Sequence, residues 1–127
     1  MALSQYLENK LINATVGNVS YTTPATVYLA LYSVPPTANT SGTELSSNGY
    51  SRQTVTFGSA ANGSASSTNT VTFGPATANW SPIVGSAVTD ASSGGNILYF
   101  AGIAAAQVVL NGSSLVLGTG NVTVSLT

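Results

Sequence analysis

The segment Thr26-Val-Tyr-Leu-Ala-Leu-Tyr-Ser33 indicates the fold class most clearly. Successive side chains of an extended strand point to opposite faces of its sheet. Both faces of this strand are apolar, with Val27, Leu29 and Leu31 on one side and Tyr28, Ala30 and Tyr32 on the other. We therefore expect a central strand that is covered on both sides. Pro35-Pro36 ends the strand, because proline has no N–H to donate to a neighbouring strand.

The same alternation recurs downstream in short stretches that turn residues separate. With residues 26–33, the expected strands are residues 50–57, 68–73, 83–89, 97–103, 107–110, 114–117 and 121–127. Two turns between them predict hairpins, at the glycine-bearing segment 90–96 and at Asn111-Gly112. Residues 37–49 predict a long loop, and residues 58–67, almost wholly Gly, Ser, Ala and Asn, predict a flexible connection.

Residues 2–14 predict one helix, because Leu3, Leu7 and Leu11 recur at a spacing of four. Gly17 is the expected stop. This helix either covers one side of the core or forms an arm that docks on a neighbouring subunit.

The sum is an all-β fold, an antiparallel β-sandwich or jelly-roll-like domain of about eight strands with one short N-terminal helix. We expect a single domain over residues 1–127, with a helical segment at 1–17 and strands across 20–127.

Charge is almost absent from the chain. The five charged side chains among 127 residues are Glu8, Lys10, Glu44, Arg52 and Asp90, and there is no His and no Cys. An average domain carries about 25% charged residues, whereas this one carries 4%. Two cations cannot form a basic surface, so neither nucleic acid nor membrane is an expected partner. Apolar runs stay below the ~20 residues of a membrane span, and the N-terminus does not resemble a signal peptide.

The usual catalytic constellations cannot be assembled from these residues. A serine nucleophile would have only Lys10 as its base, and the three acids each have a simpler local role, such as Asp90 at the start of a turn. Zinc prefers His or Cys ligands, and Asp90 with Asn96 would make a weak calcium site. We predict no catalytic residues, no cofactor-binding residues, no metal site and no enzymatic activity.

Arg52 and Trp80 are two further residues for which the sequence suggests a role. Arg52 lies in an expected strand, where a fixed ion pair or carbonyl clamp with Glu44 or Asp90 is its simplest role, and a partner contact is the alternative. Trp80 lies among turn residues, where it can close one end of a sandwich while its N–H finds an acceptor. The aromatic residues that could instead bind a glycan are Tyr21, Tyr28, Tyr32, Tyr50, Trp80 and Tyr99.

Several phrases of the sequence are similar to one protein family in their order and spacing. They are Met1 to Leu11, Pro24 to Tyr32, Gly49 to Gly58, Thr77 to Trp80, Asp90 to Leu98 and Gly120 to Leu126. Together they resemble small virion proteins of tailed bacteriophages, often labelled tail-fibre proteins, and similar small β proteins act as capsid cement. The resemblance implies a non-enzymatic structural role in a phage particle, and no catalytic residues carry over from it.

We therefore expect a virion structural protein that is assembled in the bacterial host cytoplasm. A capsid decoration (cement) protein that binds the major capsid protein is favoured narrowly over a tail or tail-fibre component that binds tail proteins. In either role we expect the protein to form a homo-oligomer. A module that binds host-surface glycans is a further alternative.

Overall fold

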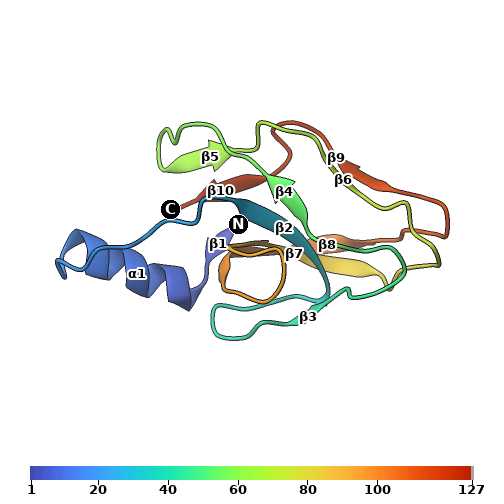
Figure 1. Cartoon of the computed structure of the whole chain (residues 1–127), viewed down its shortest axis with the longest axis horizontal. Coiled ribbons are helices and arrows are strands. Elements are labelled where there is room, and N and C mark those ends of the chain that lie inside the picture. Colours follow the sequence, from blue (N-terminus) through green and yellow to red (C-terminus); the bar gives the residue numbers. More distant parts are fainter. Residues whose placement is uncertain (127) are drawn as a thin grey trace.

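The structure is a computed structural model that describes residues 1–126. Figure 1 shows one helix and a set of short strands. In chain order they are β1 (Ala2–Leu3), α1 (Gln5–Thr15), β2 (Val27–Val34), β3 (Thr43–Glu44), β4 (Gln53–Val55), β5 (Ser64–Ser66), β6 (Val71–Phe73), β7 (Ile83–Thr89), β8 (Ile97–Gln107), β9 (Leu115–Leu117) and β10 (Thr123–Ser125).

The main sheet is antiparallel and has the order β1-β8-β7-β2-β3, with β4 also paired to β2. Strand β2 lies at its centre, and residues Leu29 to Tyr32 are at most 2% exposed. The predicted central strand with two covered faces is therefore confirmed. The predicted hairpin around residues 90–96 is also confirmed, since β7 and β8 pair on either side of it, from Thr89 and Ile97 to Gly85 and Gly102.

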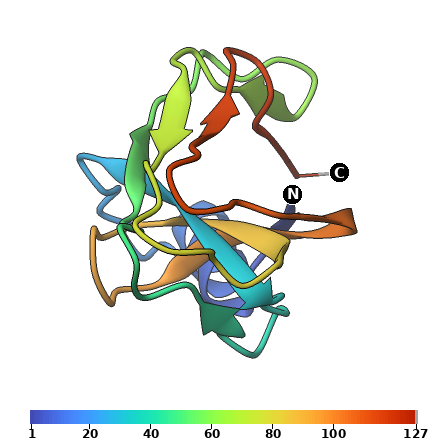
Figure 2. The same ribbon diagram turned by 90° about the vertical axis from the view of Figure 1, so that its right-hand side faces the viewer.

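A second layer covers one face of this sheet. It consists of two separate antiparallel pairs, β5 with β10 and β6 with β9, and Figure 2 shows β5 and β10 standing apart from the main sheet. The prediction of an all-β, sandwich-like fold with one short helix is confirmed. Jelly-roll connectivity and the single-domain organisation stay predictions.

The main core lies between the two layers, where every second side chain along a strand is buried away from water. Its largest fully buried apolar side chains are Phe73, Leu29, Leu31, Ile83, Val55, Val71 and Val88. A smaller cluster on the opposite face of the sheet joins Ala30, Tyr32 and Ala87. Both faces of β2 therefore contribute to stability, as its sequence predicts.

Helix α1 begins later than predicted, because Ala2 and Leu3 pair with β8 as strand β1. Ser4 is its N-cap, and the Ser4 hydroxyl accepts a hydrogen bond from the Leu7 N–H. Leu7 is the one buried residue of the helix. The rest of α1 projects from the body (Figure 1), and no helix within residues 1–126 has the length and apolar character needed to cross a bilayer.

Four sequence-based predictions about strands and loops were wrong. Residues 58–67 contain β5, which pairs with β10, and the expected loop 37–49 contains β3. Of the expected strand 107–110, only Gln107 lies in a strand, as the last residue of β8. Asn111-Gly112 does not connect the two strands of a hairpin. Instead, β9 pairs with β6, and the backbone N–H of Trp80 donates to the carbonyl of Val109. Long-range backbone pairing overrides the local turn signal here.

The remaining strands are shorter than predicted. Residues 50–57 contribute Gln53–Val55, residues 68–73 contribute Val71–Phe73, and residues 121–127 contribute Thr123–Ser125. Thr127, the last residue of that expected strand, lies outside the described residues.

Candidate functional site

Arg52 holds three segments together. Its Nε and Nη2 donate to the two carboxylate oxygens of Glu44, at 2.9 and 2.8 Å. Its Nη1 donates to the carbonyl oxygens of Ala91 and Gly94, each at 2.8 Å. Only 9% of the Arg52 side chain is exposed. The prediction of an ion pair and carbonyl clamp is confirmed, and it ties β3 and the start of β4 to the loop between β7 and β8.

Tyr50 extends this arrangement into the core. Its hydroxyl donates to Glu44 Oε2 at 2.6 Å and accepts from the Leu31 N–H at 3.0 Å. Burial alone would raise the pKa of Glu44, but the hydrogen bonds from Arg52 and Tyr50 outweigh it and hold that pKa below its ordinary value. Burial, with the Glu44 hydrogen bond, raises the pKa of Tyr50. Glu44 is therefore a fixed anion, poorly suited to proton transfer.

Of the other charged residues, Asp90 lies in the loop that Arg52 binds and Lys10 lies on α1. The Asp90 carboxylate accepts from the backbone N–H and the side-chain amide of Asn96, at 2.7 and 3.0 Å, and so closes the loop between β7 and β8. Lys10 is exposed on α1, with its Nζ 5.6 Å from the centre of the Tyr6 ring. Within residues 1–126, no group of three or more acidic residues could hold a metal ion.

Of the six candidate glycan-binding aromatics, two are buried and four, Tyr21, Tyr28, Tyr50 and Tyr99, are partly buried. Trp80 is 5% exposed, and its Nε1 donates to the Asn48 carbonyl at 2.7 Å, so the predicted plug with a satisfied N–H is confirmed. Tyr50 packs edge-on against Trp80 and stacks on Phe73, with ring centres 5.9 and 6.1 Å apart. Tyr32 is also buried. These rings have no free face for a sugar to stack on.

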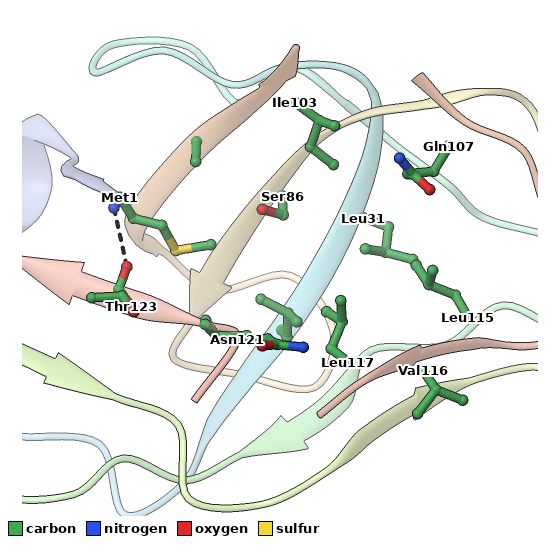
Figure 3. A pocket seen from close by; sticks show the side chains of 13 residues that line it. Met1, Leu31, Ser86, Ile103, Gln107, Leu115, Val116, Leu117, Asn121 and Thr123 are labelled. Atoms are coloured by element: carbon green, nitrogen blue, oxygen red, sulfur yellow. Dashed lines mark hydrogen bonds between the residues drawn. The ribbon is translucent and has the colours of Figure 1, made fainter. Parts of the chain in front are cut away.

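A partly open cavity of about 580 Å³ lies between the two layers (Figure 3). Leu29 and Leu31 of β2 contribute to its floor, Ala101, Ile103 and Gln107 come from β8, and β9 supplies the opposite wall. The α-amino group of Met1 donates to the Thr123 carbonyl at its rim. No charged side chain lines it, and its mostly apolar lining also includes Ser86, Gln107, Asn121 and Thr123. Sequence reasoning missed this cavity, because it depends on how the second layer covers the sheet.

Strand β8 borders this cavity and is the exposed edge of the main sheet beyond Phe100. Strand β1 pairs only with Tyr99 and Phe100, and residues 104–107 are exposed. Val108 and Leu110, which follow directly, are 64% and 54% exposed. The one sequence signal for this surface is the run Ala101-Gly-Ile-Ala-Ala-Ala-Gln107, which has no charge and no alternation of polar and apolar residues.

Arg52, Glu44 and Asp90 are engaged in the clamp and in a turn, while the main cavity is lined mostly by apolar side chains. No curated protein matches the chain. Residues 2–125 match the family described as Podophage GP4 fiber I protein gp80. Because that match covers nearly the whole chain, the protein belongs to this family of phage fiber proteins.

Proposed function

We propose that this protein is a non-enzymatic structural component of a phage fiber. Membership of a phage fiber family makes it a component of the virion. The family match over residues 2–125 is the observation that carries the proposal. The fold supports it, because Arg52 and Asp90 stabilise the loop between β7 and β8 and the main cavity is lined mostly by apolar side chains. In this role the chain is assembled in the host cytoplasm and contacts other tail proteins.

Capsid decoration, bound to the major capsid protein, is the second candidate. The near absence of charge and the strand-rich fold suit a cement protein, since such a contact would be held by apolar burial and backbone hydrogen bonds. The two roles differ in copy number, because a decoration protein follows the high symmetry of the capsid and a fiber component follows that of the tail.

Imaging separates the two roles. Purified particles are labelled with an antibody against this protein and viewed by electron microscopy, while its copy number is measured by quantitative mass spectrometry against the major capsid protein. The proposal expects label at the tail and few copies. Label distributed over the capsid shell would overturn the fiber role in favour of decoration.

A further inference from the structure

We propose that Asn62 is a site of spontaneous deamidation, a modification that adds a carboxylate to this charge-poor chain. The sequence contains three Asn-Gly dipeptides, at residues 48–49, 62–63 and 111–112, and all three are exposed. Exposure therefore does not distinguish them. The hydrogen bonds of the peptide group inside each dipeptide do, and they favour reaction at Asn62. This inference does not rest on the proposed fiber role.

Deamidation joins the side chain of an asparagine to the backbone of the next residue. The Gly63 nitrogen loses its proton and attacks the side-chain carbon Cγ of Asn62. The new N–Cγ bond forms as the Cγ–Nδ2 bond breaks, and the side-chain nitrogen leaves as ammonia. Water then opens the cyclic imide at either carbonyl, which leaves an aspartate or an isoaspartate at this position. Gly63 has no side chain to hinder the approach.

The attack requires a particular orientation of the peptide group between Asn62 and Gly63. The flanking residues Ala61 and Ser64 exchange two backbone hydrogen bonds, of 2.9 and 3.1 Å. The central residues have φ of 53° and 73°, and positive φ at both is the type I′ hairpin turn. Rotation of the central peptide group alone gives a type II′ turn, in which ψ of Asn62 is about −120°. That rotation brings the Gly63 nitrogen beside the Asn62 side chain.

No hydrogen bond opposes this rotation at Asn62. Within residues 1–126, neither the Asn62 carbonyl nor the Gly63 N–H has a hydrogen-bond partner. The Gly63 carbonyl accepts from the Leu126 N–H at 2.9 Å, but it belongs to the next peptide group. The two hydrogen bonds that flank the turn also lie outside the rotating group. The rotation therefore costs only the strain of a type II′ turn, which favours glycine at its first central position.

Asn48-Gly49 has the same turn geometry but a fixed peptide group. Its φ values are 61° and 86°, again positive at both residues. The Asn48 carbonyl, however, accepts from Trp80 Nε1 at 2.7 Å and from the Thr77 N–H at 3.0 Å. Rotation of this peptide group would break both hydrogen bonds and leave the N–H of a buried indole without its acceptor. Asn48 is therefore held in the unreactive orientation.

Asn111-Gly112 is held through the nitrogen that would attack. The Gly112 N–H donates to the Ala76 carbonyl at 2.7 Å, and the Asn111 N–H donates to Asn79 Oδ1 at 2.8 Å. Each hydrogen bond that must break lowers the reactive population by roughly fivefold. We therefore expect Asn62 to react at least about fivefold faster than Asn48 or Asn111.

The first test compares the three sites within one sample. The purified folded chain is incubated at mildly alkaline pH in heavy-oxygen water, which labels each new carboxylate, and chymotryptic peptides are then quantified by mass spectrometry. Deamidation during digestion in ordinary water carries no label and is not counted. We expect label mainly at Asn62. No label there, or equal or faster labelling of Asn48 or Asn111, would overturn the proposal.

Unfolding the chain separates structure from local sequence. In concentrated urea the hydrogen bonds at Asn48 and Asn111 are lost, whereas the three dipeptides keep the same chemistry. The three rates should then converge, since Asn62 loses its advantage. If Asn62 keeps the same lead in urea as in the folded chain, the hydrogen bonds are not the cause of its reactivity.

The variant Asn62→Gly provides the matched control, because Gly-Gly also suits a type I′ turn and has no side-chain amide. Each deamidation changes the net charge of the chain from −1 to −2, which isoelectric focusing resolves. We expect the wild type to accumulate this acidic form and the variant to lack it, with circular dichroism confirming that both are folded. An acidic form that accumulates equally in the variant would contradict reaction at Asn62.

Discussion

At the scale of single residues, the clearest structural role belongs to Arg52. An arginine presents a planar fork of donors, so it can bind both oxygens of one carboxylate and still reach carbonyl groups. Here the fork engages Glu44, while Nη1 reaches Ala91 and Gly94. A mostly buried guanidinium is tolerated because its charge is paired and its donors are used.

Removing the negative charge of this pair should destabilise the fold. Glu44→Gln keeps the shape but leaves Arg52 without its counter-ion, and we expect a loss of about 2 kcal/mol in the free energy of unfolding. Urea titration followed by Trp80 fluorescence measures it. Glu8→Gln, at an exposed helix position, is the control and should change the free energy by less than ~0.5 kcal/mol. Equal effects of the two variants would argue against the clamp.

The same carboxylate predicts an acid dependence of stability. The pKa of Glu44 is lowered in the folded state from its ordinary value of 4.5. The stabilisation is therefore complete above pH values near 4.5 and is lost as the pH falls through the lower folded pKa. The difference in unfolding free energy between wild type and Glu44→Gln should shrink from neutral to acidic pH. A difference that is constant with pH would contradict this.

At the scale of elements, two glycines that face each other across β7 and β8 have opposite surroundings. Gly85 pairs with Gly102. A Cβ on Gly85 would lie 2.9 Å from the Pro35 Cα, whereas a Cβ on Gly102 would meet nothing within 4 Å. The close approach of the Pro35 backbone requires glycine at position 85 alone.

Alanine substitutions at the two glycines should therefore have different effects on stability. Gly85→Ala is expected to cost about 1–3 kcal/mol of unfolding free energy, because the backbone near Pro35 must shift. Gly102→Ala should be neutral or stabilise by about 0.5 kcal/mol, since it restricts the unfolded chain. Thermal unfolding by calorimetry measures both. Similar losses for both variants would show that packing against Pro35 is not the cause.

The attachment of α1 depends on one buried hydroxyl. The Ser4 side chain caps the helix at Leu7 and donates to the Ile97 carbonyl of β8. Ser4→Ala removes the cap and leaves that carbonyl unpaired, so we expect a loss of about 1–2 kcal/mol. Chemical denaturation and far-ultraviolet circular dichroism measure stability and helix content. The exposed Ser20→Ala is the control, and an equal loss there would refute the capping role.

At the scale of the whole molecule, a chain with 4% charged residues should adhere by apolar contact and backbone hydrogen bonding. Screening by salt weakens contacts between exposed charges and leaves such adhesion intact. We therefore expect virions washed at about 0.1 M and about 1 M salt to retain equal numbers of copies. Quantitative mass spectrometry of the washed particles provides the count. Release at moderate salt would indicate a charged interface and count against both structural roles.

Local patterns were sufficient to predict the elements that are strongly amphipathic or apolar. The central strand around Leu29, the hairpin between residues 83 and 103 and the presence of an N-terminal helix follow from periodicity and turn chemistry. The Arg52 clamp was predictable for a related reason. A lone guanidinium in a strand requires an anion, and Glu44 was one of two acids proposed for it.

Other features depend on partners far away in the chain. The Ser- and Gly-rich residues 64–66 form a strand only because residues 123–125 lie beside them. Asn111-Gly112 does not form its predicted hairpin, since β6 competes for β9.

The sequence by itself determined the all-β class, the scarcity of groups for chemistry and the low charge of the chain, because composition and periodicity act locally. Only the tertiary structure decided which strands pair and where the sandwich stays open. Pairing energy is shared between distant segments, and the cavity beside β8 exists only once both layers are in place.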